Sequence, residues 1–402
     1  MSLPLDGIRV LELGNFIAGP FCGMLLGDMG ADVIKIERPE RGDQTRAMPP
    51  LVNGESASFA ALNRNKRSLV LDLKQQAARD IVIALVKQSD VFLENNRPGA
   101  LESVGLGPEQ VRAVKPDIVY VSASGFGQSG PYRRRAGVNL IIEAFAGPLS
   151  VTGAPDEMPM RPGLQTADIF GALFATYAAL AGLMGVMRGK GGRVADVSLV
   201  ESSIAAAAWE AAAYLATGEV PQRLGHQHRL NAPYQLFETH DGRYLAIGTP
   251  NDELFRRFMT VLGLADCIQD PRFATYVLRK QNEKDLLAVV TPAIRARDLE
   301  GLERLLVEAG VPCSPVNDYR QVFEHEHVRA RKVLEEVQHP RMGKMRAVRN
   351  PVLFDHDGPS IRRPAPLLGE HSREILRDLG YTHAQIDSLA SSGAVMLGAL
   401  RE

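Results

Sequence analysis

The first 125 residues alternate between short β-rich runs and helical stretches, and this alternation limits the possible folds more than any other feature. Residues 8–13 read IRVLEL, a β-rich run that Gly14 ends. Residues 19–29 carry apolar side chains at helical spacing, and residues 32–37 form a second β-rich run. A strand, a helix and a strand within about thirty residues make the repeating unit of a parallel sheet covered by helices.

The same alternation continues beyond residue 37. It predicts strands over 68–73, 90–94 and 118–122, helices over 77–88 and 108–114, and a loop over 125–131. Regular alternation of this kind favours a doubly wound α/β sheet, in which ligands bind beyond the carboxyl ends of the strands. We therefore expect a large, Rossmann-like domain with an open parallel sheet.

The character of the sequence changes near residue 216, where we expect a second domain. A chain of 402 residues is too long for one ordinary core. Residues 234–247 read as a hairpin with an Asp-Gly turn, and helical patterns follow near 252–263, 281–296 and 298–309. We place a small α+β domain over 220–325. The tail after residue 330 is rich in proline and basic residues and closes with a helix over 372–379.

Composition excludes several classes of function. The formal net charge is -1, so neither nucleic acid nor a membrane surface is an expected partner. Cys22, Cys267 and Cys313 have no short spacing, so we expect no zinc site or disulfide framework and favour a reducing compartment, the cytoplasm. No secretory signal is visible. The apolar stretch 169–187 contains three glycines and is interpreted as a buried core helix rather than a membrane span.

The first predicted turn between a strand and a helix gives only a partial nucleotide signature. Residues 14–20 read GNFIAGP and lack the spacing G-x-G-x-x-G, although Glu37 stands where a ribose-binding acid would be. An NAD-dependent oxidoreductase is thus one alternative. Two histidine pairs, at 226 and 228 and at 325 and 327, lack accompanying ligands, so we expect no metal.

Basic and amide side chains recur where the predicted strands end. Arg38 follows the second strand, Lys74 the third, and Asn95, Asn96 and Arg97 the fourth. Guanidinium and ammonium groups gathered at the carboxyl edge of a sheet suit a phosphorylated nucleotide. Each of these side chains taken singly is typical of a solvated surface.

Asp168 stands just before the long apolar stretch. Aspartate is a favoured N-cap residue, so helix capping is the simplest interpretation. The same placement suits a nucleophile, because the start of a helix lowers the pKa of a carboxyl group and keeps it ionised. An ionised carboxylate attacks activated carbonyl groups. The spacing leaves both interpretations open.

The chain resembles the class III CoA-transferases, the CaiB/BaiF family, over nearly its whole length. The resemblance rests on a set of short motifs that occur in this order. They are LDGIRVL at 5–11, AGP at 18–20, GADVIKIERP at 30–39, GD at 42–43, NKRS at 65–68, ENNRPG at 94–99, GFGQSGP at 125–131 and PLLGEH at 366–371.

This resemblance implies a homodimer of two interlocked rings. Each chain then has a large CoA-binding domain built from residues 1–215 and 330–402, together with the small domain. Asp168 falls on the family's nucleophilic aspartate. Eight further residues fall on positions that hold CoA in the formyl-CoA branch: Phe16, Ile17, Arg38, Leu71, Lys74, Asn95, Asn96 and Arg97.

The implied reaction moves CoA from an acyl-CoA to a carboxylic acid through an aspartyl-CoA thioester, with no permanently bound cofactor and no metal. Ile17 replaces the glutamine of the formyl-CoA branch, and Val138 and Asn139 replace an aromatic residue and an acid, which argues against formyl-CoA chemistry. The racemases of the family use a histidine where this chain reads Gly137-Val138-Asn139.

The acceptor acid is the least determined part of this reading. A dicarboxylate such as succinate is our expectation, from what relatives use. His228, Arg229 and Arg46 are candidate contacts for a substrate carboxylate. An α-methylacyl-CoA racemase and a non-catalytic CoA-binding protein are the alternatives.

Overall fold

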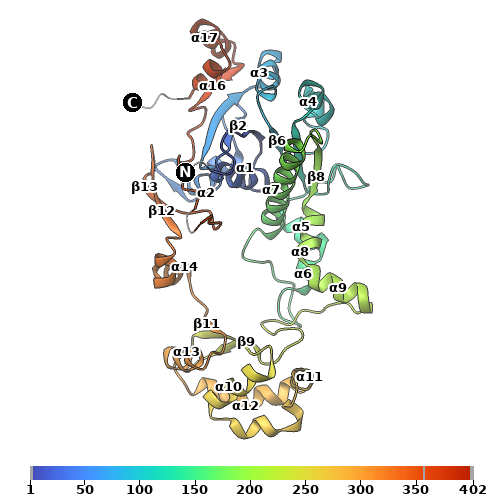
Figure 1. Cartoon of the computed structure of the whole chain (residues 1–402), viewed down its shortest axis with the longest axis vertical. Coiled ribbons are helices and arrows are strands. Elements are labelled where there is room, and N and C mark those ends of the chain that lie inside the picture. Colours follow the sequence, from blue (N-terminus) through green and yellow to red (C-terminus); the bar gives the residue numbers. More distant parts are fainter. Residues whose placement is uncertain (1–2, 356–357, 399–402) are drawn as a thin grey trace. The chain divides into compact units, whose positions relative to one another are not determined.

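The computed structural model describes residues 3–355 and 358–398. The chain divides into two compact units (Figure 1). The first combines Met1–Pro148, Pro162–Thr217 and Arg331–Glu402, so it takes in both ends of the chain. The second combines Leu149–Arg161 with Gly218–Ala330.

The first unit is built on a parallel sheet, as the alternation predicts. Across the described residues, seven strands lie in the order β14-β5-β2-β1-β6-β7-β8, and only the edge strand β14 is antiparallel. Numbered along the chain, the parallel strands follow the order 3-2-1-4-5-6 of a Rossmann fold. The strands are β1 (Arg9–Leu13), β2 (Asp32–Glu37), β5 (Lys66–Leu71), β6 (Val91–Glu94), β7 (Val119–Ser124), β8 (Val194–Ser198) and β14 (Val395–Met396).

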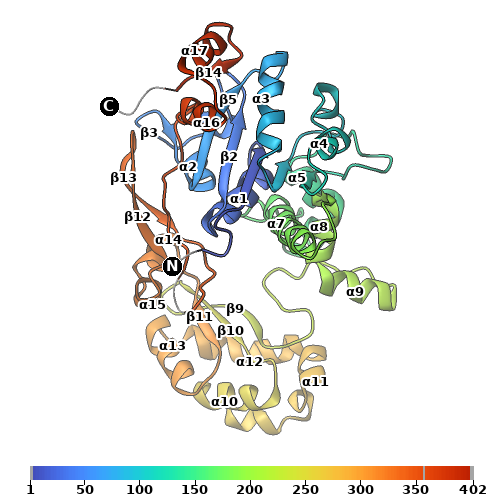
Figure 2. The same cartoon turned by 45° about the horizontal axis from the view of Figure 1, so that its top comes forward.

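Helices cover both faces of this sheet, and the alternation of strand side chains determines which core each residue joins. Val10 and Val33 pack under α1 (Ala18–Asp28) and α7 (Thr166–Met187). Leu11 and Ile34 point to the opposite face. That face is covered by α3 (Gln76–Val86), α4 (Pro108–Val114), α16 (Ser372–Asp378) and α17 (His383–Ser391). Figure 2 shows α3 and α16 beside β5 and β2.

Several elements of the first unit have no clear signal in the sequence. β8 is short and half polar, which hid it from the period-2 pattern. In the tail, which the sequence showed as rich in proline and basic residues, residues 334–339 and 343–348 pair as an antiparallel hairpin. The remaining elements of this unit are β3 (Leu51–Val52), β4 (Glu55–Ser56), α2 (Ala57–Asn63), α5 (Asn139–Ala146), α8 (Leu199–Ala206), α9 (Ala208–Thr217), β12 (Leu334–His339) and β13 (Gly343–Val348). The short helix α6 (Pro148–Val151) leads from the first unit into the second.

The long helix α7 is buried on one side only, which corrects the expectation of a buried core helix. Its small residues, such as Gly171 and Gly182, face the sheet and its neighbours. The large side chains Tyr177 and Met187 are 69% and 83% exposed. By length and composition alone, α7 is the one helix of the described residues that could cross a membrane.

The second unit contains the predicted hairpin. β9 (Tyr234–Glu238) pairs antiparallel with β10 (Tyr244–Gly248), and β11 (Cys313–Pro315) joins the other edge of β10. Amphipathic helices pack on this small sheet around Phe237, Leu245 and Phe258. They are α10 (Asp252–Leu262), α11 (Tyr276–Gln281), α12 (Glu283–Arg295) and α13 (Leu299–Glu308), followed by α14 (Tyr319–Glu324) and α15 (Glu326–Ala330).

Candidate active site

The order of the strands reverses between β1 and β6, which are neighbours in the sheet. Ligands of open α/β sheets bind in the crevice at this switch point, beyond the carboxyl ends of the strands. The turn after β1 contains Phe16 and Ile17, and the loop after β6 contains Asn95, Asn96 and Arg97. The structure therefore brings these five predicted residues to the switch point.

Side chains hold the backbone of the first turn in place. The amide of Asn95 accepts a hydrogen bond from the Asn15 N–H at 2.8 Å and donates one to the Asn15 carbonyl oxygen at 2.8 Å. Asn96 donates to the carbonyl oxygen of Leu13 at 2.9 Å. These two amides thus shape the turn, a role that the sequence did not indicate. Phe16 adopts a left-handed conformation with φ of 62°.

The other four predicted CoA contacts differ in how far their side chains are exposed to a ligand. Arg38, Lys74 and Arg97 are exposed at the ends of β2, β5 and β6. Leu71 closes β5 with a side chain that is only 1% exposed and packs in the core. Its side chain has no surface to offer a ligand, so any contact there must use the backbone.

A cavity of about 760 Å³ lies beside the end of β2. Leucine and methionine side chains of the C-terminal segment form one part of its wall, including Leu367 and Met396. Arg38 and Arg41 also line it, and within the described ranges neither forms an ion pair. The cavity therefore offers an apolar wall together with two guanidinium groups, and the carboxylates of Glu40 and Glu55 lie in the same lining.

Asp168 lies in the first turn of α7, two residues after Thr166, which begins the helix. The N-cap position belongs to Gln165, so of the two interpretations of Asp168 the helix cap is wrong. Because β7 and β8 are parallel, the helix between them runs back against the strands and begins at the carboxyl edge. Ala167 packs in the same small core cluster as Ala18 of α1, close to the first turn.

Two side chains of α5 accept hydrogen bonds from the backbone N–H groups at the start of α7. The side-chain oxygen of Asn139 accepts from the N–H groups of Ala167 at 3.0 Å and Asp168 at 3.3 Å. Oε1 of Glu143 accepts from the N–H of Thr166 at 3.1 Å. Asn139 and Glu143 are four residues apart on α5, so they lie on the same face of that helix. The carboxylate of Asp168 is left without these donors.

This arrangement reverses the expected electrostatics of Asp168. The start of a helix was predicted to lower the pKa of its carboxyl group. Instead, burial and, to a smaller extent, the negative charge of Glu143 raise the pKa of Asp168 to about 6. Within residues 3–355 and 358–398, no group donates a hydrogen bond to the Asp168 carboxylate, which is half-buried and remains open to a ligand. The group is still mostly ionised at neutral pH and is more basic than an ordinary aspartate.

One acidic and one basic residue that the sequence suggested as ligand contacts, Glu37 and Arg46, instead pair with each other inside the protein. Glu37 is 4% exposed and accepts two hydrogen bonds from Arg46, both at 2.7 Å, and one from the Ser68 hydroxyl at 2.7 Å. The guanidinium of Arg46 also lies over the ring of Phe59. Glu37 is not placed to bind a ribose, nor Arg46 to bind a substrate carboxylate.

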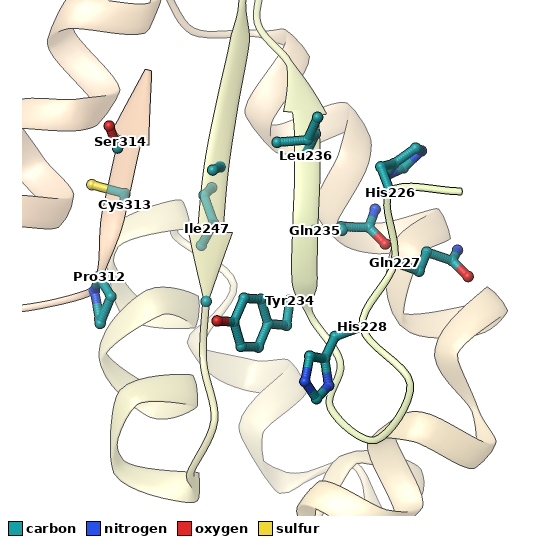
Figure 3. A pocket seen from close by; sticks show the side chains of 12 residues that line it. His226, Gln227, His228, Tyr234, Gln235, Leu236, Ile247, Pro312, Cys313 and Ser314 are labelled. Atoms are coloured by element: carbon teal, nitrogen blue, oxygen red, sulfur yellow. The ribbon is translucent and has the colours of Figure 1, made fainter. Parts of the chain in front are cut away.

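The second unit has a cavity of about 470 Å³ along its small sheet (Figure 3). The rings of His228 and Tyr234 stack there with centroids 4.6 Å apart. Gln235 is 7% exposed, and its Oε1 has no hydrogen-bond partner among the residues that the structure describes. Of the other two residues predicted to contact a substrate carboxylate, His228 lines this cavity, and Arg229 instead donates a hydrogen bond to the carbonyl oxygen of Gln222.

Sequence reasoning missed Asn139 and Glu143 as functional residues. Their spacing of four residues on a short apolar segment was the available signal, because it places both side chains on one face of a helix. Within the described part of the chain, no three His, Cys, Asp or Glu side chains gather closely enough to hold a metal ion.

Comparison with known proteins gives a consistent picture. A model of CoA-transferase family III matches residues 5–372. The succinyl-CoA:glutarate CoA-transferase of Mus musculus is 38% identical over 98% of this chain and 90% of its own length. The succinate–glutarate CoA-transferase of Agrobacterium fabrum is 37% identical over 94% of this chain and 96% of its own.

A solved structure has the same fold. The crystal structure of a CaiB/BaiF family protein from Brucella suis superposes with a TM-score of 0.83 at 35% identity. The match covers 94% of this chain and all of that chain.

Proposed function

Because this chain belongs to CoA-transferase family III, we propose that it moves CoA between short dicarboxylic acids with Asp168 as the covalent carrier. The chain is a CoA-transferase of the class III type. The proposal concerns its substrates and its nucleophile. The observation that carries it is a carboxylate of raised pKa at the carboxyl edge of the sheet, to which no group in the described part of the chain donates a hydrogen bond.

The chemistry of the proposed cycle balances without another reactant. The Asp168 carboxylate attacks the thioester carbonyl carbon, the C–S bond breaks, and CoA leaves as a thiolate. The thiolate then attacks the aspartyl carbonyl of the mixed anhydride, which releases the first acid and leaves CoA on Asp168. The carboxylate of the second acid repeats these steps in reverse, so that a new acyl-CoA departs and Asp168 is regenerated.

The electrostatics of Asp168 support this role. A carboxylate nucleophile has to be ionised, and its attack is faster when it is more basic. Burial beside Glu143 raises the pKa of Asp168 to about 6, which satisfies both conditions near neutral pH. Removal of the helix N–H donors by Asn139 and Glu143 also leaves the carboxylate oxygens free for the attack.

The nucleotide end of CoA has a matching surface in the same unit. We place its phosphates at Arg38 and Arg41 and its adenine against the leucines and methionine of the cavity beside β2. A cavity of about 760 Å³ is large enough for a nucleotide. Guanidinium groups suit phosphate oxygens in charge and in geometry. Lys74 and Arg97, on the flanking strands, extend this positive edge.

The names of the relatives support dicarboxylic acids as substrates. The Mus musculus and Agrobacterium fabrum proteins are described as acting on succinyl-CoA or succinate together with glutarate. Both cover almost the whole of this chain. We propose succinyl-CoA as donor and a dicarboxylic acid of similar length as acceptor.

We also propose that the enzyme works as an interlocked homodimer in a reducing compartment such as the cytoplasm. The outer side of α7 is apolar and exposed, and α9 has no buried residue although it carries Trp209, which is 65% exposed. A second copy of the chain would cover these surfaces. The three cysteines are free thiols. Sedimentation at several concentrations tests the dimer, and a monomer at micromolar concentration would exclude it.

An exchange assay with succinyl-CoA and a panel of mono- and dicarboxylic acids tests the proposed function. We expect new acyl-CoA only with dicarboxylic acids. Asp168→Ala should lose at least about a thousandfold in turnover while it keeps its affinity for CoA. Asp156→Ala, at an exposed aspartate of the second unit, is the control and should retain full activity. Full exchange activity in Asp168→Ala would exclude Asp168 as the carrier.

A further inference from the structure

A fully buried network of charges lies directly beneath the first turn. The ammonium group of Lys35 contacts Glu12 Oε1 at 2.8 Å, the carbonyl oxygen of Gly14 at 2.8 Å and Asp43 Oδ2 at 2.9 Å. The other oxygen of Glu12 pairs with Lys66 at 2.7 Å. The side chains of Glu12, Lys35, Asp43 and Lys66 have no exposed surface. Three oxygen atoms thus surround the Lys35 ammonium, two through hydrogen bonds and the third, of Asp43, through an ion pair.

This network reaches the turn through Asp43. Oδ2 of Asp43 pairs with Lys35, while Oδ1 accepts hydrogen bonds from the Phe16 N–H at 3.2 Å and from the Thr45 N–H at 2.9 Å. The hydroxyl of Thr45 donates to the same oxygen at 2.8 Å. The carboxylate of Asp43 is thus fixed on both sides before it meets the turn.

The turn needs such support because its conformation is costly. Phe16 has a φ of 62°, a left-handed conformation that a bulky side chain rarely adopts. Four groups now hold the backbone from Leu13 to Phe16: Asn96 at the Leu13 oxygen, Lys35 at the Gly14 oxygen, Asn95 at both polar groups of Asn15, and Asp43 at the Phe16 nitrogen. The turn is therefore preorganised by side chains rather than by regular secondary structure.

We propose that Asp43, oriented by Lys35, is a positioning residue that holds the first turn in the conformation that binds CoA. The residue touches neither substrate nor the reacting atoms and acts through the Phe16 N–H. The inference rests on the proposed function in one respect, namely that CoA meets this turn. A buried ion pair contributes little net stability, because desolvation of the charges offsets their attraction. The geometry it imposes on Phe16 is its function here.

The matched experiment compares Asp43→Asn with Asp28→Asn. Asp28, like Asp43, is a buried aspartate paired with a basic residue. It accepts two hydrogen bonds from Arg64, at 3.0 Å and 2.7 Å, but it lies at the C-terminal end of α1, away from the first turn. In Asp43→Asn the amide donors oppose the Lys35 ammonium, so the side chain cannot keep both contacts. Affinity for free CoA is measured by calorimetry, together with kcat, KM for succinyl-CoA and the melting temperature.

We expect both variants to melt at lower temperature, and only Asp43→Asn to bind CoA at least tenfold more weakly. Its KM for succinyl-CoA should rise by the same factor while kcat at saturation stays within about threefold. Equal CoA affinities in the two variants would overturn the inference. Thr45→Val, which removes one donor to Asp43 and keeps the size of the side chain, covers the case in which Asp43→Asn does not fold. We expect it to bind CoA about threefold more weakly, and an unchanged affinity would also overturn the inference.

This test does not depend on the nucleophile. CoA binding is measured without turnover. A wild-type protein that binds CoA but exchanges none refutes the proposed function, and the CoA affinities of Asp43→Asn and Asp28→Asn still decide the positioning role. Conversely, loss of exchange in Asp168→Ala combined with equal CoA affinity in Asp43→Asn and Asp28→Asn refutes the positioning role alone.

Discussion

The side-chain oxygen of Asn139 lies 3.3 Å from the backbone nitrogen of Asp168 and accepts its N–H. A carboxylate at the start of a helix ordinarily accepts such donors itself and becomes a weaker base. Here side chains of the neighbouring helix α5 accept the N–H groups at the start of α7 instead. Asp168 consequently keeps free oxygens and a pKa raised to about 6 by burial and by Glu143. The same contact fixes the start of α7, so the proposed nucleophile is both oriented and basic.

The activity should depend on pH through Asp168. We expect kcat to fall as the pH drops through about 6, because protonation removes the nucleophile. An ordinary aspartate would stay ionised down to about pH 4. Initial rates of CoA exchange between pH 4.5 and 8, at saturating substrates, measure this fall of kcat on the acidic side. A rate that is flat down to pH 4.5 would contradict the raised pKa.

Two substitutions on α5 should shift the pH at which kcat falls, the acidic limb of the pH profile, in opposite directions. Glu143→Gln keeps the oxygen that accepts from Thr166 but removes the negative charge, so the pKa of Asp168 should fall and the limb should move to lower pH. Asn139→Asp keeps the acceptor for Asp168 and adds a negative charge, so the limb should move to higher pH. Glu201→Gln, in the first turn of α8, is the control. Shifts of the same sign in both α5 variants would refute the electrostatic account.

The charge of Asp168 should also lower stability above pH 6. The folded protein raises the pKa of this group above its unfolded value of 3.8, so between about pH 4 and 6 the folded state binds more protons than the unfolded state. Stability from this group is therefore present at low pH and lost as the pH rises through 6. We expect Asp168→Asn to melt above the wild type at pH 7.5, with a smaller difference at pH 5. Thermal melts at both values, with Asp156→Asn as the reference, decide this; a difference that grows toward pH 5 has the wrong sign.

Two glycines of α7 should respond oppositely to alanine. A Cβ at Gly182 would lie 2.5 Å from Cγ1 of Val119 on the sheet, so Gly182→Ala should destabilise the protein by ~1–3 kcal/mol. A Cβ at Gly185 would meet nothing within 4 Å, so Gly185→Ala should stabilise it by ~0.5–1 kcal/mol through helix propensity. Denaturant unfolding measures both. If the two changes have the same sign, the packing of α7 against β7 is wrongly described.

The alternation of strands and helices was enough to predict the parallel sheet and its ligand-binding edge, because buried parallel strands and their helices leave strong periodic signals. β1, β2, β6 and α7 all lie close to their predicted ranges. β8 was missed because only its last two residues are buried and its sequence VADVS is too short and polar to alternate clearly. Tertiary contacts, not local propensity, make it a strand.

The chemistry of the site was less accessible to the sequence. The position of Asp168 near a helix start was correct, but the predicted direction of its pKa shift was wrong. Burial raises this pKa most, the charge of Glu143 adds to it, and Asn139 and Glu143, more than twenty residues earlier, accept the helix N–H groups. The asparagines after β6 were predicted as ligand contacts, and their amides turn out to hold the first turn. Long-range partners of this kind are set by the fold and leave no local pattern.

The most direct test of the account is to trap the carrier. The protein is incubated with succinyl-CoA in the absence of acceptor, treated with hydroxylamine or with borohydride, digested, and analysed by mass spectrometry. We predict that the hydroxamate or the reduced side chain appears at Asp168 alone, and only when the acyl-CoA is present. Modification at another residue, or an unmodified Asp168 in a preparation that exchanges CoA at full rate, would contradict the central claim.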